Sequence, residues 1–247
     1  MAHDLTNLLR EWPYDEEHMI RKILADDGRE VLQVRLPLGI EQYELEERPD
    51  GFHPNGFESV LDELEAELAA HVEHEGSATG FEVDHDTATR LHGEGLLYYY
   101  RYLMLFQISD YERVSRDTEH NLRLCRILEE YCPIEEDRNA VLQFKPYILR
   151  MNAVARAMIA VNQQAKGVAR SILESAIDEI DGLEDIDAAA FRFERVRSVN
   201  YLKSALEQID DQVGDAEEHL QRQLSQAVEE ENYERAAELR DQLRNLQ

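Results

Sequence analysis

Histidine and carboxylate side chains gather between residues 71 and 92, where they could ligate a divalent metal. They are His71, Glu73, His74, Glu75, His85 and His92. Imidazole and carboxylate groups at helical spacing are ordinary ligands of divalent metals. The solvated end of an acidic helix is the better interpretation of the same residues, because neither an HExxH motif nor a cysteine partner is present. We therefore expect no metal and no cofactor, and a metal-dependent enzyme that uses this cluster remains an alternative.

Motifs for other catalytic chemistry are also absent from the sequence. There is no G-x-S-x-G nucleophile elbow, no P-loop and no G-x-G-x-x-G turn. Pairs of carboxylates are not evidence for acid–base catalysis, because a chain with 53 acidic residues contains such pairs by chance. We expect a protein without catalytic residues.

The loop from Arg48 to Gly56, RPDGFHPNG, is the densest polar loop in the chain. It presents Arg48, Asp50, His53 and Asn55. Loops of this composition often carry function. A structural turn that pins a sheet against a helix has the same composition, and both interpretations stay open.

The segment from Leu96 to Ile108 is the most apolar part of the sequence. It is interrupted by Arg101 and Gln107 and is too short to cross a bilayer. Its aromatic residues Tyr98, Tyr99, Tyr100, Tyr102 and Phe106 point in different directions around a helix. They favour packing between helices over a flat stacking platform. With no basic, apolar leader at the start, we expect a cytoplasmic protein without a membrane segment.

The charge of the chain limits its partners. Asp and Glu outnumber Lys and Arg by 53 to 26, which gives a net charge of −27. Proteins that bind nucleic acids neutralise phosphates with basic side chains. The charge therefore argues against direct contact with DNA or RNA. The two cysteines, Cys125 and Cys132, are expected to be reduced and partly buried.

The periodicity of apolar residues predicts a mainly α-helical fold with a small antiparallel β meander at the N-terminus. Short runs at 19–24, 31–36 and 40–45 are separated by turn residues and predict the three strands. From Phe57 the pattern becomes helical, and Gly76 and Gly80 end the first helix. Further helices are predicted at 86–107, 110–131, 136–164, 167–181 and 189–212. Pro146 should kink the 136–164 helix or start a new one.

Two breaks in the helical region look alike. One lies at Ser109–Val114 and the other at Gln163–Ala169, and each leads from an apolar helix through a short polar turn into another helix. This arrangement resembles tetratricopeptide-type helical hairpins, in which a pair such as Asp110-Tyr111 opens the second helix. The expected small residues are only partly present, so an unrelated bundle of hairpins remains the alternative. In both cases the helix pairs must stack to bury their apolar faces.

The last 28 residues predict a separate antiparallel helical hairpin. Leu220, Leu224 and Ala227 form one apolar stripe, and Ala236, Leu239, Leu243 and Leu246 form a second. The polar break at 229–232 separates the two runs, and Asn232 suits the N-cap of the second helix.

This tail resembles the UVR motif of the bacterial excision-repair proteins UvrB and UvrC. The matching residues are Leu224, Ala227-Val228, Glu231, Tyr233, Glu234, Ala236-Ala237, Leu239-Arg240-Asp241 and Leu243. The resemblance implies a bacterial origin and a protein–protein contact, either with another UVR-type hairpin or with a second copy of the chain. The candidate interaction residues are Leu220, Leu224, Ala227, Val228, Tyr233, Ala236, Ala237, Leu239, Arg240 and Leu243.

These observations predict three parts: a β-rich module at 1–56, a helical body at 57–212 and the hairpin at 215–247. We expect an adaptor that holds one partner on its body and another on its hairpin, linked to bacterial excision repair or a stress response. A repair subunit that contacts nucleic acid is a further alternative. The sequence leaves the partner's identity and the oligomeric state open.

Overall fold

A computed structural model describes residues 4–229 and 233–246, without the side chains of 210–219, 222, 225–229, 233–234 and 245–246. The chain divides into two compact units, Met1–Leu142 and Gln143–Gln247. The division into 1–56, 57–212 and 215–247 stays a prediction.

The first unit contains the predicted β meander. Its strands are β1 (Ile20–Leu24), β2 (Glu30–Leu36) and β3 (Gly39–Glu44), in the order β1-β2-β3 with both pairs antiparallel. Gly28, with φ +87°, makes the turn between the first two strands, because a left-handed backbone favours glycine. Residues 31–35 of β2 are all buried, so both faces of the central strand are covered. A short helix, α1 (Thr6–Glu11), precedes the sheet and was not predicted.

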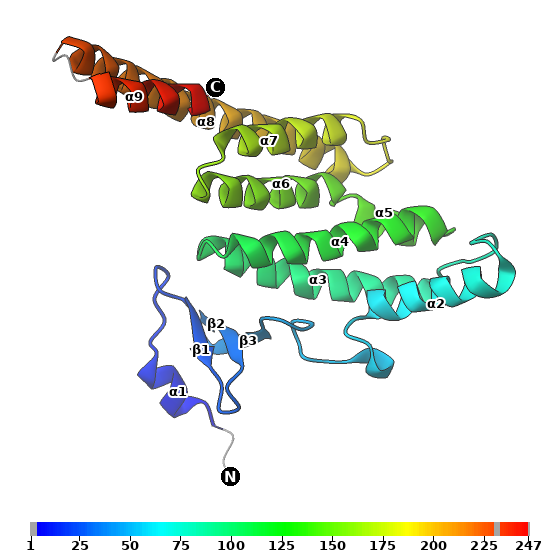
Figure 1. Ribbon diagram of the computed structural model, residues 1–247. Helices are drawn as coiled ribbons and strands as arrows, with labels where there is room; N and C mark the ends of the chain where they lie inside the picture. The colour runs from blue at the N-terminus through cyan, green and yellow to red at the C-terminus, as the bar shows by residue number, and fades with distance from the viewer. Residues whose placement is uncertain (1–3, 230–232, 247) are drawn as a thin grey trace. The chain divides into compact units, whose positions relative to one another are not determined.

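The rest of the first unit is helical (Figure 1). Its elements are the 3₁₀ turn η1 (Pro54–Gly56), α2 (Val60–Glu75), α3 (His85–Gln107), α4 (Tyr111–Tyr131) and α5 (Glu135–Leu142). Side chains at the helix starts satisfy free main-chain N–H groups: Ser59 accepts from Asp62 N, and Asp84 accepts from Thr87 N. Both cysteines lie in this unit, and both are buried.

The second unit contains the remaining helices (Figure 1). They are α6 (Lys145–Asn162), α7 (Lys166–Asp181), α8 (Ala189–Glu229) and α9 (Tyr233–Leu246). Helices α6, α7 and α8 pack against one another in all three pairs. The helix predicted at 136–164 is two helices, and Pro146 stands in the first turn of the second. This agrees with the preference of proline for a position whose N–H has no helical partner.

Helix α8 is longer than predicted, so the predicted end at residue 212 was wrong. It continues through Gly214 to Glu229 and forms one helix of 41 residues. One glycine in a helix interior costs only about 1 kcal/mol. The surrounding helix-forming residues compensate for that cost. The first helix of the predicted hairpin is therefore the C-terminal part of α8.

The two turns that look alike in the sequence have the same geometry. Ser109 and Gln164 both adopt left-handed conformations, with φ of 59° and 61°. The next N–H donates in each case to a carbonyl five residues earlier: Asp110 N to Leu105 O at 3.0 Å, and Ala165 N to Ala160 O at 2.8 Å. The α3–α4 and α6–α7 hairpins thus share a turn, and Asp110 is the N-cap of α4. Membership of a tetratricopeptide-type fold stays a prediction.

Candidate functional site

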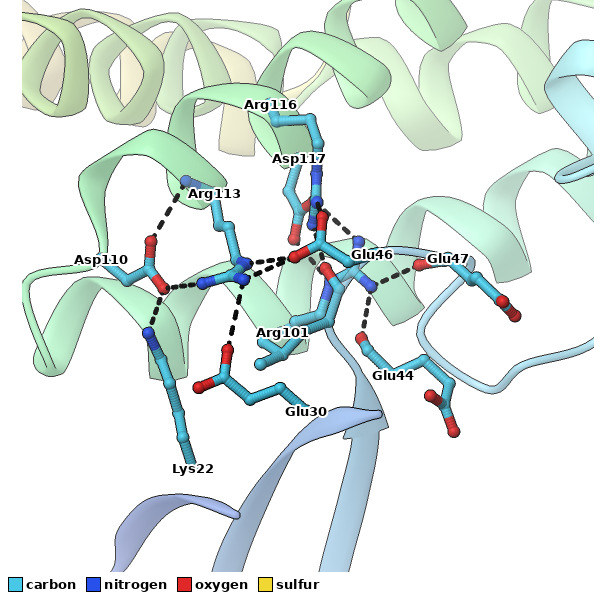
Figure 2. A network of polar contacts seen from close by, with 11 residues as sticks. Lys22, Glu30, Glu44, Glu46, Glu47, Arg101, Asp110, Arg113, Arg116 and Asp117 are labelled. Carbon is cyan, nitrogen blue, oxygen red and sulfur yellow. Dashed lines mark hydrogen bonds and ion pairs between the residues drawn. The ribbon is translucent and has the colours of Figure 1, made fainter. Parts of the chain in front are cut away.

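Arg101 lies at the centre of a polar network that joins the sheet to α3 and α4 (Figure 2). Its Nε and Nη2 donate to the two carboxylate oxygens of Asp117, each at 2.7 Å. Its Nη1 donates to the main-chain oxygens of Glu44 and Glu47, at 2.6 and 2.5 Å. Arg101 and Asp117 are both buried. The guanidinium therefore ties the end of β3 and the following loop to both helices.

Asp110 connects β1 to the start of α4. Lys22 Nζ donates to Asp110 Oδ2, and Arg113 Nη1 donates to the same oxygen at 2.8 Å. Burial alone would raise the pKa of Asp110. The hydrogen bonds from Lys22 and Arg113 outweigh burial and hold that pKa below its ordinary value of 3.8. Asp110 is therefore an ionised partner for both cations at neutral pH.

Glu46 completes the network from the loop after β3. It accepts from Arg113 Nε at 2.9 Å and from Arg116 Nη1 at 2.9 Å. The hydrogen bond from Arg113 lowers the pKa of Glu46, against the opposing effect of burial. The charged groups of the network satisfy one another (Figure 2). This arrangement of ion pairs holds the sheet on the helices. The charged side chains named here are paired with one another, so the network is structural and not catalytic in character.

A second buried carboxylate explains the polar loop at Arg48–Gly56. Glu94 is fully buried and accepts from the main-chain N–H groups of Val60 at 2.7 Å and Leu61 at 3.1 Å, which caps α2. Arg48 Nε lies 3.4 Å from the same carboxylate.

The loop is also held at its other polar residues. Asn55 donates to Glu63, and the His53 ring lies 3.1 Å from Glu47. These contacts hold the loop against α2 and against the segment that follows β3.

The histidines near residues 71–92 have separate neighbours. His71 Nε2 lies 3.1 Å from Thr79 O, and His74 Nδ1 lies 2.8 Å from the adjacent Glu75. His85 contacts Asp137 at 2.8 Å, and this hydrogen bond raises the pKa of His85 above 6.5. Within residues 4–229 and 233–246, no group of three or more His, Cys, Asp or Glu side chains could hold a metal.

Helix α3 carries the apolar segment singled out in the sequence. Tyr98 and Tyr102 of this segment are buried, and the Tyr98 ring stacks on His120 with centroids 3.7 Å apart. Burial raises the pKa of the Tyr98 hydroxyl. In the described part of the chain, no helix is long and apolar enough to cross a membrane.

The C-terminal hairpin consists of the end of α8 packed against α9 (Figure 1). Ala236 and Leu239 of α9 are 8% and 1% exposed, and the partly buried Leu220 and Leu224 of α8 pack against them. All four belong to the two apolar stripes found in the sequence. The hairpin therefore has a small core of its own.

The other candidate residues occupy different positions. Leu243 is half-buried, and Ala237 and Arg240 are exposed on α9. The side chains of Ala227, Val228 and Tyr233 lie outside the described part, as do residues Glu231 and Asn232.

The surface of the hairpin combines apolar and charged groups. Leu220, Leu224 and Leu243 are only partly covered. The exposed face of α9 carries Arg235, Glu238, Arg240, Asp241 and Arg244, and Arg235 donates to Glu238 at 2.7 Å. A partly covered apolar stripe beside charged side chains can pair with another amphipathic helix. The geometry thus defines a helical hairpin suited to protein–protein contact.

Comparison with known proteins places this segment in a family. Residues 218–247 match the family model of the UvrB/uvrC motif. No curated protein and no solved structure matches the chain. The match covers the hairpin alone, and it suggests a role in UvrABC-type excision repair or in protein or DNA interaction.

Proposed function

We propose that the chain is a non-enzymatic adaptor that binds a partner protein through the α8–α9 hairpin. The partner is another UVR-type hairpin, on a different protein or on a second copy of this chain. The proposal extends to a role in excision repair or a stress response. The observation that carries it is the UVR motif at residues 218–247, in the form of a hairpin with a very small core.

The energetics of the hairpin support this proposal. The two helices of the hairpin bury a single narrow stripe, here centred on Ala236 and Leu239. Leu220, Leu224 and Leu243 remain partly exposed. Burying a leucine side chain completely contributes about 1.5–3 kcal/mol. Pairing with a second hairpin would cover these side chains and add their burial to the stability of both.

Charge favours a protein partner over a nucleic acid. The net charge of −27 opposes the approach of phosphates, and the arginines of α9 alternate with acidic residues. A hairpin with both signs can form complementary pairs with a hairpin of the same kind.

Deletion of residues 215–247 tests the proposal. Full-length protein and the deletion variant are compared in a pull-down against an immobilised UVR hairpin, for which residues 215–247 of this chain fused to a carrier are one bait and a UvrB-type hairpin is the other. We expect capture by at least one bait and its loss on deletion. Capture that is unchanged by the deletion would contradict the proposal, as would no capture by either bait.

Point variants separate the apolar stripe from the charged face. The double variant Leu220→Ala/Leu224→Ala should weaken capture on the order of tenfold or more, since each truncation removes apolar contact. Arg240→Ala, at an exposed position on the other helix, tests the charged face and should weaken capture less. Circular dichroism of each variant checks that the helices persist.

A further inference from the structure

The face between α6 and α8 in the second unit holds a buried guanidinium. Arg150 is 5% exposed, and its Cζ lies 4.8 Å from the Tyr147 ring centroid and 5.3 Å from that of Tyr201. Two aromatic rings thus flank a cation, one on each helix. Such contacts stabilise a guanidinium without using its N–H groups.

The polar groups around Arg150 are incompletely satisfied. Arg150 Nη1 lies 3.9 Å from Glu194 Oε2, beyond hydrogen-bond distance. Glu194 Oε2 and Ser198 Oγ are both buried without a hydrogen-bond partner among those residues. Burial lowers the pKa of Arg150, only partly offset by Glu194. Buried polar groups are nearly always hydrogen-bonded, so this cluster is built for a further partner.

The cluster differs in charge from the rest of the chain. Arg197 lies on α8 beside Arg150, with its Nη1 3.4 Å from Glu194 Oε1 and its side chain 59% exposed. Two arginines and one glutamate leave a local excess of positive charge in a protein of net charge −27. An anionic group is therefore favoured at this position.

We propose that Arg150, Arg197 and Ser198 bind a carboxylate of an acidic peptide, with Tyr147 and Tyr201 on either side. The planar guanidinium of Arg150 matches a carboxylate in two parallel hydrogen bonds. Ser198 donates a third hydrogen bond, and Arg197 turns toward the ligand from the solvent side. Glu194 limits affinity by repulsion, which keeps the site specific for a singly charged group rather than a phosphate.

This site gives the helical body a partner of its own and extends the proposed adaptor function. It does not depend on the hairpin, because all five residues precede residue 202. Failure of the hairpin to capture a partner would leave the carboxylate site unaffected, and the reverse also holds.

Nuclear magnetic resonance of the full-length chain labelled with ¹⁵N-arginine tests the site. N-acetyl-aspartate is the first probe. We expect the Nε–Hε signal of Arg150 to move in a saturable manner, with a dissociation constant on the order of 1 mM. A short acidic peptide with free carboxylates should bind about tenfold more tightly than this probe. The same peptide with Asn and Gln in place of Asp and Glu and an amidated C-terminus should not bind.

Three substitutions are expected to change carboxylate binding in different directions. Arg150→Gln should abolish the response. Ser198→Ala should weaken binding several-fold without lowering stability, because it removes a buried hydroxyl that has no partner. Glu194→Gln should strengthen binding several-fold by removing the repulsion. These two variants decide the question even if Arg150→Gln fails to fold.

Arg156→Gln is the matched control. Arg156 is an exposed arginine on α6 that lines a separate cavity with Ser171 and Ser175 of α7. Its substitution should leave binding unchanged.

Three results would overturn the proposal. The first is an Arg150 signal that carboxylates do not move, and the second is weaker binding by Glu194→Gln. The third is a short oligothymidylate that binds through Arg150 more tightly than the acidic peptide, which would make the ligand a nucleic acid.

Discussion

The Arg101 guanidinium and the Asp117 carboxylate face each other in a two-point contact, with both N–O distances at 2.7 Å and both side chains buried. Breaking a buried ion pair leaves an uncompensated charge in the interior. The remaining donors of Arg101 hold the main chain at Glu44 and Glu47. The Arg101–Asp117 ion pair therefore holds the end of β3 and the following loop against α3 and α4.

Asp117→Asn should lower the free energy of unfolding by about 3–5 kcal/mol, because it leaves the Arg101 charge buried without its counterion. Urea denaturation monitored by circular dichroism gives this value. Arg126→Ala is the control, since Arg126 and Glu119 form an exposed pair at 2.7 Å with side chains 60% and 49% exposed. That variant should cost about 0–1 kcal/mol. Similar losses in both variants would argue against a special role for the buried pair.

Asp110→Asn should change how stability depends on pH. The folded-state pKa of Asp110 lies below its ordinary value of 3.8. Its ionisation therefore contributes stability that is fully present above 3.8 and is lost as the pH falls through the lowered folded-state pKa. The difference between wild type and variant should be largest at neutral pH and should shrink under acid conditions. Denaturation at a series of pH values measures it.

Asparagine at position 110 keeps the helix cap, so this substitution isolates the charge. Asp84→Asn provides the comparison, because Asp84 caps α3 through Thr87 N at 2.8 Å and lies at an exposed position. Its effect on stability should be smaller. A difference for Asp110→Asn that persists unchanged at low pH would contradict the ionic explanation.

Added salt should stabilise the protein. Screening weakens attractive ion pairs and like-charge repulsion together, but 53 acidic residues against 26 basic ones make repulsion the larger effect. The screening length falls from about 10 Å at 0.1 M to about 3 Å at 1 M salt. The thermal midpoint should therefore rise with potassium chloride in differential scanning fluorimetry.

Replacement of exposed acids tests the cause of that rise. Glu67→Gln/Glu73→Gln removes two negative charges from an exposed part of α2 and should make the midpoint less dependent on salt. A midpoint that falls with salt in the wild type would mean that ion pairs such as those around Arg113 dominate instead.

Local patterns were sufficient to predict most secondary structure. Strand alternation around Val31–Leu36 and the turn at Gly28 predicted the sheet, and the position of Pro146 predicted a break before α6. These features depend on nearest neighbours in the chain. The end of α8 was mispredicted because Gly214 is a weak stop signal in an otherwise helix-forming segment.

Contacts between distant residues were not predictable in the same way. Arg101 stood out as a charge within an apolar run, but nothing in the sequence identified Asp117 as its partner or Glu44 as its acceptor. Arg150 carried no such signal, because Glu194 and Tyr201 beside it come from α8, more than forty residues further along the chain. The motif at 218–247 was recognisable because its residues are contiguous.

The unbroken course of α8 has a consequence for how two ligands could be held at once. Ser198 and Leu224 lie on the same helix, whose rise of 1.5 Å per residue places them roughly 40 Å apart along its axis. A continuous helix restricts this span, whereas a flexible linker would allow a range of spans. A bivalent partner gains avidity only if its own two contact elements match that length.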